Sequence, residues 1–366
     1  MSFERLAVPA IQALRAYDPG HDLVAWRRRV GPSLVELGSN ENPWGASPAA
    51  RAAVLDQLHA MHRYPDPLGG DLKRALAAKH GVDVAQIILG NGSHELLMQF
   101  AQVFAEPGDE VVASQYGFAV YAIATQAVGA TLRAAPALSR ASSMPRGHDL
   151  DALAASIGPR TKLVYLANPN NPTGTWFGSD ALDAFLQRVP RDVVVVVDEA
   201  YAEFVEGGAT ALSLLPSHPN LVIARTFSKA YALAGLRVGF AVADPGLIAV
   251  VERVRESFNV NCMGLAAAEA ALGDVEHLQW GLARNAEERA ALADALASRG
   301  WFVHPSQTNF LLVEFGDRTQ AIEAALLERG VVPRPMGGYG LPGCLRITVG
   351  DRDENRRLLT VLDEIG

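Results

Sequence analysis

The feature that most constrains this fold is the alternation of short apolar runs with longer segments of helical period, between about residues 85 and 243. The run of valines at 193–197 is the clearest of these strands. Such alternation is typical of a parallel sheet with crossover helices. The near-continuous apolar character indicates that both faces of the sheet are covered. We expect strands at 87–89, 110–113, 131–134, 163–166, 193–197, 221–224 and 238–242.

The pattern changes after Gly264, where the sequence becomes rich in Ala, Leu, Glu and Arg. Residues 266–297 are predicted to be helical, followed by strands at 309–314 and 344–349 and helices at 319–329 and 353–365. We therefore expect an α/β protein with a mostly parallel central sheet and a smaller α+β domain. The predicted division is an arm at 1–40 that packs on the small domain or a partner subunit, a large domain at 41–263 and a small domain at 264–366.

Composition excludes several classes of protein. The formal net charge of −8 argues against a general nucleic-acid binder, which must neutralise phosphates. The two cysteines, Cys262 and Cys344, have no metal-like spacing and predict no disulfide framework, which fits a reducing cytoplasm. Because charged residues flank the densest apolar stretch, no membrane span is expected. No metal site is expected either.

Polar motifs follow four of the predicted strands. They are Gly-Asn-Gly-Ser at 90–93, Asn-Pro-Asn-Asn-Pro-Thr-Gly at 168–174, Asp-Glu-Ala-Tyr at 198–201 and Thr-Phe-Ser-Lys at 226–229. Since ligands of open α/β sheets bind outside the carboxyl ends of the strands, these motifs should converge on one rim. The glycine turn leading into a helix could bind a phosphate, although a turn capped by Ser93 is an equal alternative.

Asp198 and Lys229 suggest the chemistry of this rim. A carboxylate that ends a valine run enters a low-dielectric site and needs a cationic partner, which a protonated pyridine nitrogen can be. A lysine with depressed basicity, beside Arg237, can form a Schiff base. Taken singly, Asp198 could cap a turn and Lys229 could be solvated. Together they indicate a pyridoxal 5'-phosphate site.

In combination, these motifs resemble the fold-type I pyridoxal-phosphate aminotransferases over nearly the whole chain. The more specific resemblance is to the histidinol-phosphate aminotransferases. It is carried by Ser-Asn-Glu-Asn-Pro at 39–43, Arg-Tyr-Pro-Asp at 63–66, Gly-Asn-Gly-Ser at 90–93, residues 230–237 ending in Arg237 and Phe-Asn-Val-Asn at 258–261, whereas Leu-Arg-Ile-Thr-Val-Gly at 345–350 belongs to the wider resemblance.

The resemblance implies a role for each site residue. Lys229 would form the Schiff base and shuttle a proton, and Asp198 would pair with the pyridine nitrogen. The other implied cofactor contacts are Asn171 and Tyr201 at the phenolic oxygen, Tyr116 stacked on the ring, and Ser93, the His94 backbone, Ser228 and Arg237 at the phosphate, with Tyr64 reaching that phosphate from the neighbouring subunit of a homodimer.

For the substrate, the resemblance implies that Arg346 clamps a carboxylate, while Arg334 and Tyr17 receive a substrate phosphate. Guanidinium geometry suits such bidentate contacts. His94 replaces an acidic residue that many members carry. Tyr339 could line the pocket or end a turn.

The implied reaction is transamination between L-histidinol phosphate and 2-oxoglutarate, giving imidazole acetol phosphate and L-glutamate. An aromatic amino-acid aminotransferase and a phospho-amino-acid decarboxylase use the same cofactor residues and remain alternatives. A ligand sensor of the same fold is disfavoured, because no nucleic-acid-binding pattern precedes residue 39.

Overall fold

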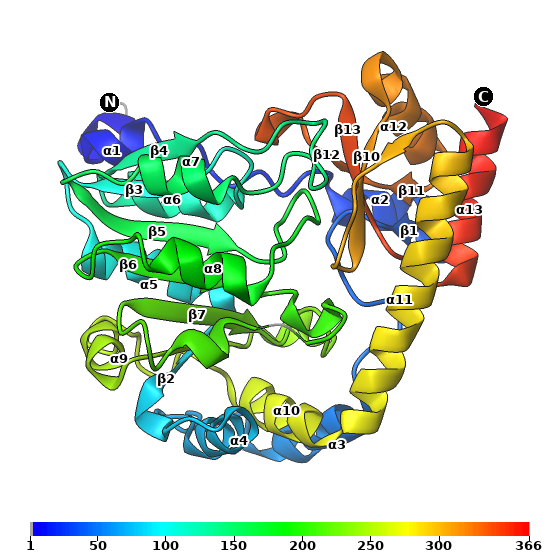
Figure 1. Ribbon diagram of the computed structural model, residues 1–366. Helices are drawn as coiled ribbons and strands as arrows, with labels where there is room; N and C mark the ends of the chain where they lie inside the picture. Colours follow the sequence, from blue (N-terminus) through cyan, green and yellow to red (C-terminus); the bar gives the residue numbers. More distant parts are fainter. Residues whose placement is uncertain (1–2, 209, 366) are drawn as a thin grey trace.

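The protein is described here by a computed structural model of residues 3–208 and 210–365, which form two bodies (Figure 1). The larger body is built on a seven-stranded sheet and the smaller on a four-stranded sheet. The long helix α11 (Val275–Ser298) runs from the helices below the large sheet to the small body.

The large sheet has the strand order β2-β8-β7-β6-β5-β3-β4. Only β8 runs antiparallel to its neighbours, so the expected mostly parallel sheet is confirmed. Each predicted strand is present, with ends shifted by at most two residues. The strands are β2 (Ile87–Gly90), β3 (Glu110–Ser114), β4 (Thr131–Ala135), β5 (Thr161–Ala167), β6 (Val194–Asp198), β7 (Leu221–Thr226) and β8 (Gly239–Ala243).

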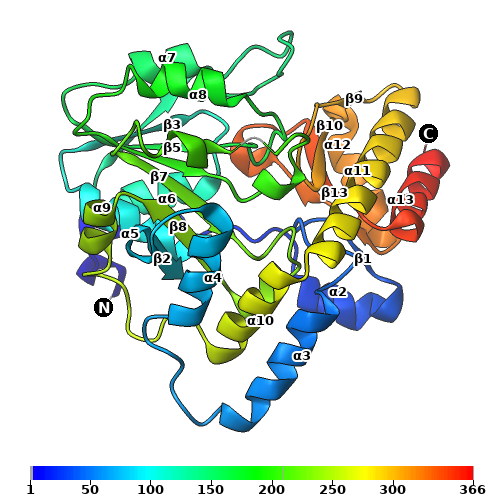
Figure 2. The same ribbon diagram turned by 60° about the horizontal axis from the view of Figure 1, so that its bottom comes forward.

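Helices cover both faces of this sheet (Figure 2). On one face, α5 (Ser93–Phe104), α6 (Ala119–Ala127) and α9 (Pro245–Val251) pack on the sheet in one apolar cluster. On the other, α7 (Leu150–Ala155) and α8 (Ser179–Leu186) do the same in a second cluster. The central strands are consequently buried on both sides, as their apolar sequence predicts.

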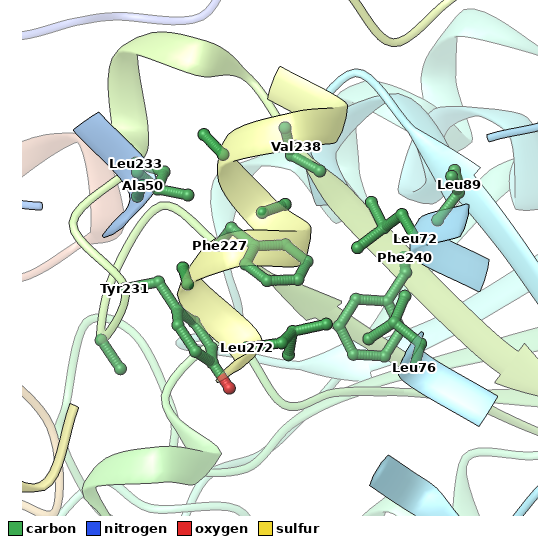
Figure 3. Close-up of a cluster of buried hydrophobic side chains, with 14 of the residues drawn as sticks. Ala50, Leu72, Leu76, Leu89, Phe227, Tyr231, Leu233, Val238, Phe240 and Leu272 are labelled. Atoms are coloured by element: carbon green, nitrogen blue, oxygen red, sulfur yellow. The ribbon is translucent and has the colours of Figure 1, made fainter. Parts of the chain in front are cut away.

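A third cluster lies where helices α3 (Pro48–Gln57), α4 (Gly70–His80) and α10 (Cys262–Gly273) meet the β2 and β8 edge. Phe227 lies at its centre, with Phe240 and Leu272 beside it (Figure 3). Helix α10 therefore packs with the large sheet, although it lies on the small-domain side of the predicted boundary. The division at residues 263 and 264 stays a prediction.

The single helix predicted at 266–297 is two helices, so this prediction is wrong in one respect. Helix α10 ends at Gly273, and α11 begins after Asp274. The Asp274 carboxylate accepts a hydrogen bond from the His277 backbone N–H, which caps α11 and permits a change of direction.

The small body combines an antiparallel sheet with helices that pack against it. Its strand order is β12-β13-β10-β9, and a separate pair joins β1 to β11 in parallel. The two strands predicted in this region are confirmed. The elements are β1 (Val35–Glu36), β9 (Phe302–Val303), β10 (Phe310–Glu314), β11 (Val331–Val332), β12 (Arg334–Pro335), β13 (Cys344–Thr348), α12 (Thr319–Glu328) and α13 (Arg352–Glu364).

The amino-terminal segment connects the two bodies. Helix α1 (Pro9–Gln12) lies beside α6, and α2 (Leu23–Val30) lies in the small body (Figure 1). Between them, residues 14–20 form neither helix nor strand. Helix α2 was not predicted, because its run of three arginines hides the apolar period. Within the described residues, no helix has the length and apolarity needed to cross a membrane.

Replacing Phe100 by Ala should destabilise the large body. Phe100 is fully buried on α5, and removing a buried aromatic ring costs about 3–5 kcal/mol of unfolding free energy. Urea denaturation followed by circular dichroism measures this loss. Val275→Ala is the control, because Val275 is 52% exposed and its truncation should cost less than about 0.5 kcal/mol. Equal effects of the two changes would contradict the packing described here.

Candidate active site

A cavity of about 450 Å³ lies at the carboxyl ends of β5, β6 and β7, between the two bodies. The predicted convergence of the polar motifs is therefore observed. The predicted site residues that line this cavity are Tyr17, Ser93, His94, Asn171, Asp198, Tyr201, Ser228, Lys229, Arg237, Arg334 and Arg346.

Lys229 follows β7 in a segment where some side chains pack in the core and others line the cavity. Phe227 and Leu233 are buried in the cluster of Figure 3, whereas Ser228 and Lys229 line the cavity. The Lys229 Nζ donates to the backbone carbonyls of Ser39 and Asn40, each at 3.1 Å. The apolar side chains thus anchor the loop that presents the amine.

The basicity of this amine is strongly depressed. Burial, followed by the positive charge of Arg346 and then that of Arg237, lowers the pKa of Lys229 to about 7. The lowered pKa of Lys229 was predicted from the sequence, but the charge effect was assigned there to Arg237. A substantial fraction of Lys229 is therefore neutral, and so nucleophilic, near pH 7.

Asp198 is the last residue of β6 and is 6% exposed. Its carboxylate accepts hydrogen bonds from the Tyr121 hydroxyl at 3.0 Å and from the Ala200 N–H at 3.2 Å. Burial nevertheless raises the pKa of Asp198 to about 6. A cation bound beside this carboxylate would offset the cost of its desolvation.

The glycine turn and Arg237 form a cup that suits an anion. A Cβ on Gly92 would lie 2.4 Å from Arg237 Nη2, and one on Gly239 would lie 2.3 Å from the Ser93 nitrogen. Both glycines are therefore required for the close approach of these groups. Arg237 Nη1 also donates to the Ser228 hydroxyl at 3.3 Å. The amino end of α5 adds its free N–H groups to the cup.

Arg346 reaches the cavity from β13. It is 7% exposed, and it donates to Asn171 Oδ1 at 2.7 Å and to the Gly38 carbonyl at 2.6 Å. Its buried Nε has no hydrogen-bond partner in the part of the chain that the structure describes. Because a buried guanidinium is costly when donors are unmatched, Arg346 is prepared for an anionic ligand.

Arg334 lies directly opposite Arg346, since the two are paired across β12 and β13. It is 8% exposed and lines the cavity with Tyr17. Two like charges at directly opposed positions are unfavourable in a sheet. The pair therefore favours a ligand that carries more than one negative charge.

Tyr116 is not among the residues that line this cavity, and its predicted stacking on the cofactor ring stays a prediction. Its ring packs with Leu312, Met336 and Leu341 of the small body and does not line the cavity. The Gly117 N–H donates to the Ser114 carbonyl oxygen, so the chain turns immediately after β3. Phe118, two residues later, lines the cavity instead. Phe118 directly precedes α6, and this placement is the sequence signal that could have identified it as a cavity residue.

Several further residues were missed or left open by the sequence. Asn40 is buried and donates to the Tyr201 hydroxyl at 2.9 Å. Tyr121, which holds Asp198, is identifiable only from the fold. Tyr339 ends the turn Gly337–Tyr339 and packs in the same cluster as Tyr116, outside the cavity lining. Tyr64 also lies outside this lining, with 81% of its surface exposed.

Residues 32–362 match the family model of class I and II aminotransferases. The chain belongs to this family. It is 46% identical to histidinol-phosphate aminotransferase 2 of Pseudomonas aeruginosa over 368 residues, which cover 99% of this chain and 98% of that protein. Histidinol-phosphate aminotransferase 2 of Pseudomonas fluorescens strain Pf-5 is also 46% identical, over 99% of this chain and 98% of that protein. The resemblance read from the sequence is thus confirmed.

Solved structures agree with this assignment. The crystal structure of histidinol-phosphate aminotransferase from Sinorhizobium meliloti, in complex with pyridoxal-5'-phosphate, matches with a TM-score of 0.89 and 32% identity, covering 98% of each chain. Aspartate aminotransferase from Thermus thermophilus shares the fold, with a TM-score of 0.85 and 22% identity over 98% of this chain and 99% of that one. The protein is a fold-type I aminotransferase that uses pyridoxal 5'-phosphate.

The cavity fits this cofactor. The cup beside Arg237 can take a phosphate, the buried Asp198 can take a cationic ring nitrogen, and Lys229 has the reactive amine. These groups lie on the walls of one cavity, together with the aromatic ring of Phe118.

In the cofactor-free protein, Lys229 should react with acetic anhydride in a pH-dependent manner, with a midpoint near 7. Ordinary lysines titrate near 10.4. Mass spectrometry of the Lys229 peptide measures the labelling at each pH. Arg346→Ala should move the midpoint upward, because it removes a positive charge that lowers the pKa of Lys229. A wild-type midpoint above about 9 would contradict the desolvated site.

Proposed function

We propose that the protein transfers the amino group of L-histidinol phosphate to 2-oxoglutarate, in histidine biosynthesis. The products are imidazole acetol phosphate and L-glutamate. The observation that carries this proposal is the cross-strand pair of Arg334 and Arg346 on one wall of the cavity that contains Lys229. The name of the Pseudomonas aeruginosa relative supports the same substrate.

The bound cofactor supplies an electron sink for the charge that develops at the substrate α-carbon. Lys229 Nζ would hold the cofactor covalently between turnovers and would take the proton from the substrate α-carbon during transamination. Its lowered pKa suits a base that works near neutral pH. Asp198 keeps the ring nitrogen protonated, and Tyr121 orients the Asp198 carboxylate through its hydroxyl.

The remaining groups orient the cofactor. We assign Asn171 and Tyr201 to the phenolic oxygen, since both line the cavity beside Asp198. Phe118 takes the place proposed for Tyr116 against the ring. Ser93, the His94 backbone, Ser228 and Arg237 hold the phosphate. Tyr64 of the partner subunit completes that contact.

Both substrates offer anions to the arginine pair. 2-Oxoglutarate has two carboxylates, which Arg346 and Arg334 can hold separately. Histidinol phosphate has no carboxylate, so its phosphate is the only anion that it can offer. A phosphate carries about −1.5 to −2 charges at neutral pH, which suits two opposed guanidinium groups. Tyr17 lies at the same end of the cavity.

We further propose that the enzyme is a cytoplasmic homodimer. Tyr64 is exposed and stacks on Phe258 with ring centroids 4.6 Å apart. Leu55, Met61 and Leu68 are also more than 60% exposed in the same stretch of chain. A second copy that covers this apolar surface would form an isologous interface and bring Tyr64 to the partner's cavity.

A half-reaction screen tests the substrate. Conversion of the bound cofactor to its pyridoxamine form, followed by absorbance, should be fastest with histidinol phosphate. Arg334→Ala should raise the apparent dissociation constant for histidinol phosphate by about 10- to 100-fold, the usual effect of losing a charged hydrogen bond, and change that for phenylalanine much less. Faster conversion by an aromatic amino acid would contradict the proposal. Release of carbon dioxide from a phosphorylated amino acid would indicate a decarboxylase.

Subunit complementation tests the dimer. Lys229→Ala lacks the amine and Tyr64→Ala lacks the partner's phosphate contact, so each variant alone should be impaired. In a hybrid dimer, one site combines Lys229 of one subunit with Tyr64 of the other. After mixing with exchange of subunits, about a quarter of the sites should regain activity. A purely additive mixture, or a fully active monomer in sedimentation at assay concentration, would refute this arrangement.

A further inference from the structure

The arm segment Tyr17–Gly20 crosses the cavity beside Arg334. Tyr17 and Pro19 contribute to the lining, so this irregular stretch of chain forms part of the cavity wall. Immediately after it, His21 Nε2 lies 2.9 Å from Glu323 Oε1 of helix α12 in the small body. The segment therefore spans from α1 on the large body to the small body (Figure 1).

Arg334 is hydrogen-bonded to the backbone of this segment. Its Nη2 donates to the Asp18 carbonyl oxygen. The Asp18 carboxylate in turn accepts from the Gly20 N–H at 2.7 Å, which closes a tight turn. The hydrogen bond to the Asp18 carbonyl oxygen occupies one guanidinium nitrogen, and the other nitrogens of Arg334 can bind a ligand.

Gly20 lies in contact with the same guanidinium, and two independent features require a glycine there. Its φ is +86°, which L side chains rarely adopt. A Cβ at this position would also lie 2.2 Å from Arg334 Nη1, 3.0 Å from Cζ and 3.2 Å from Cδ. Because the contacts extend along the arginine side chain, rotating its tip alone does not remove the clash. A methyl group on Gly20 must therefore displace Arg334 or the arm.

We propose that Gly20 is a positioning residue that determines specificity. Because Gly20 has no side chain, the Arg334 guanidinium can occupy the space that a Cβ would fill. The proposal rests on the proposed function, in which Arg334 binds the distal anion of the substrate. Because one guanidinium contacts both the arm and that anion, the position of the arm and the binding of the anion are coupled. Specificity for the substrate tail thus depends on a residue that never touches the substrate.

The test compares donors that differ only in the phosphate. In half-reactions of the holoenzyme, Gly20→Ala should raise the apparent dissociation constant of histidinol phosphate by about tenfold or more, and that of histidinol by less than about threefold. The limiting rate at saturation should change little for either donor, because Lys229 and Asp198 are untouched.

Gly31→Ala is the matched control. Gly31 lies in the same arm and has a φ of +72°, but nothing lies within 4 Å of its would-be Cβ. This variant carries the same kind of backbone strain without displacing Arg334, so the preference for the phosphorylated donor should persist. An equal loss of preference in both variants would overturn the proposal, because strain in the arm would then explain the effect.

A double variant separates positioning from general damage. If Gly20 acts through Arg334, then Gly20→Ala should have almost no further effect on donor preference in an Arg334→Ala background. Additive losses would overturn the proposal. If Gly20→Ala does not fold, judged by circular dichroism and cofactor absorbance, Asp18→Ala replaces it. That variant removes the turn hydrogen bond and should lower the preference in the same direction, so an unchanged preference would refute the idea.

The outcomes also distinguish a failure of the proposed function from a failure of the role of Gly20. If Arg334→Ala leaves the preference for histidinol phosphate over histidinol intact, then Arg334 does not read a phosphate and the proposed function fails. If Arg334→Ala abolishes the preference and Gly20→Ala preserves it, only the positioning role of Gly20 fails.

Discussion

The burial of Asp198 is the constraint on which the rest of the site depends. A carboxylate at the end of a fully buried strand loses its hydration, and two hydrogen bonds leave its pKa raised to about 6. A cationic ring nitrogen beside it restores the balance. The pKa of the Lys229 amine is shifted downward instead, because burial and the charge of Arg346 both disfavour its protonated form. The same desolvated cavity therefore gives Asp198, a carboxylate that can pair with the cofactor ring nitrogen, and Lys229, a neutral amine that can hold the cofactor.

The second constraint is that these groups belong to different bodies. Asp198 and Lys229 come from the large sheet, whereas Arg334 and Arg346 come from the small one. Arg346 bridges the two through its hydrogen bond to Asn171. Arg334 is instead tied to the arm. The large sheet thus positions the cofactor groups, while the small body and the arm position the substrate groups.

The sequence predicted the fold and the cofactor site well, because both follow from periodicity and from the ends of parallel strands. Asp198 ends such a strand and Lys229 comes shortly after another, so their positions depend little on the conformation of long loops. Tyr116 was predicted to stack on the cofactor ring, whereas Phe118 is the nearby aromatic residue that lines the cavity, because the chain turns directly after β3. Gly20 was not singled out at all, since its close approach to Arg334 joins residues that are distant in sequence.

The arginine pair links the electrostatic cost of this site to its selectivity. Opposed guanidinium groups repel each other, and the buried Nε of Arg346 lacks a partner among the described residues. A ligand with one negative charge relieves only part of this cost, whereas a dicarboxylate or a phosphate dianion can satisfy both groups. The two anions of 2-oxoglutarate and the single phosphate of histidinol phosphate place this charge differently. In the proposed function, Arg346 is hydrogen-bonded to Asn171 of the large body and Arg334 to the arm, so different parts of the chain position the two groups that bind these anions.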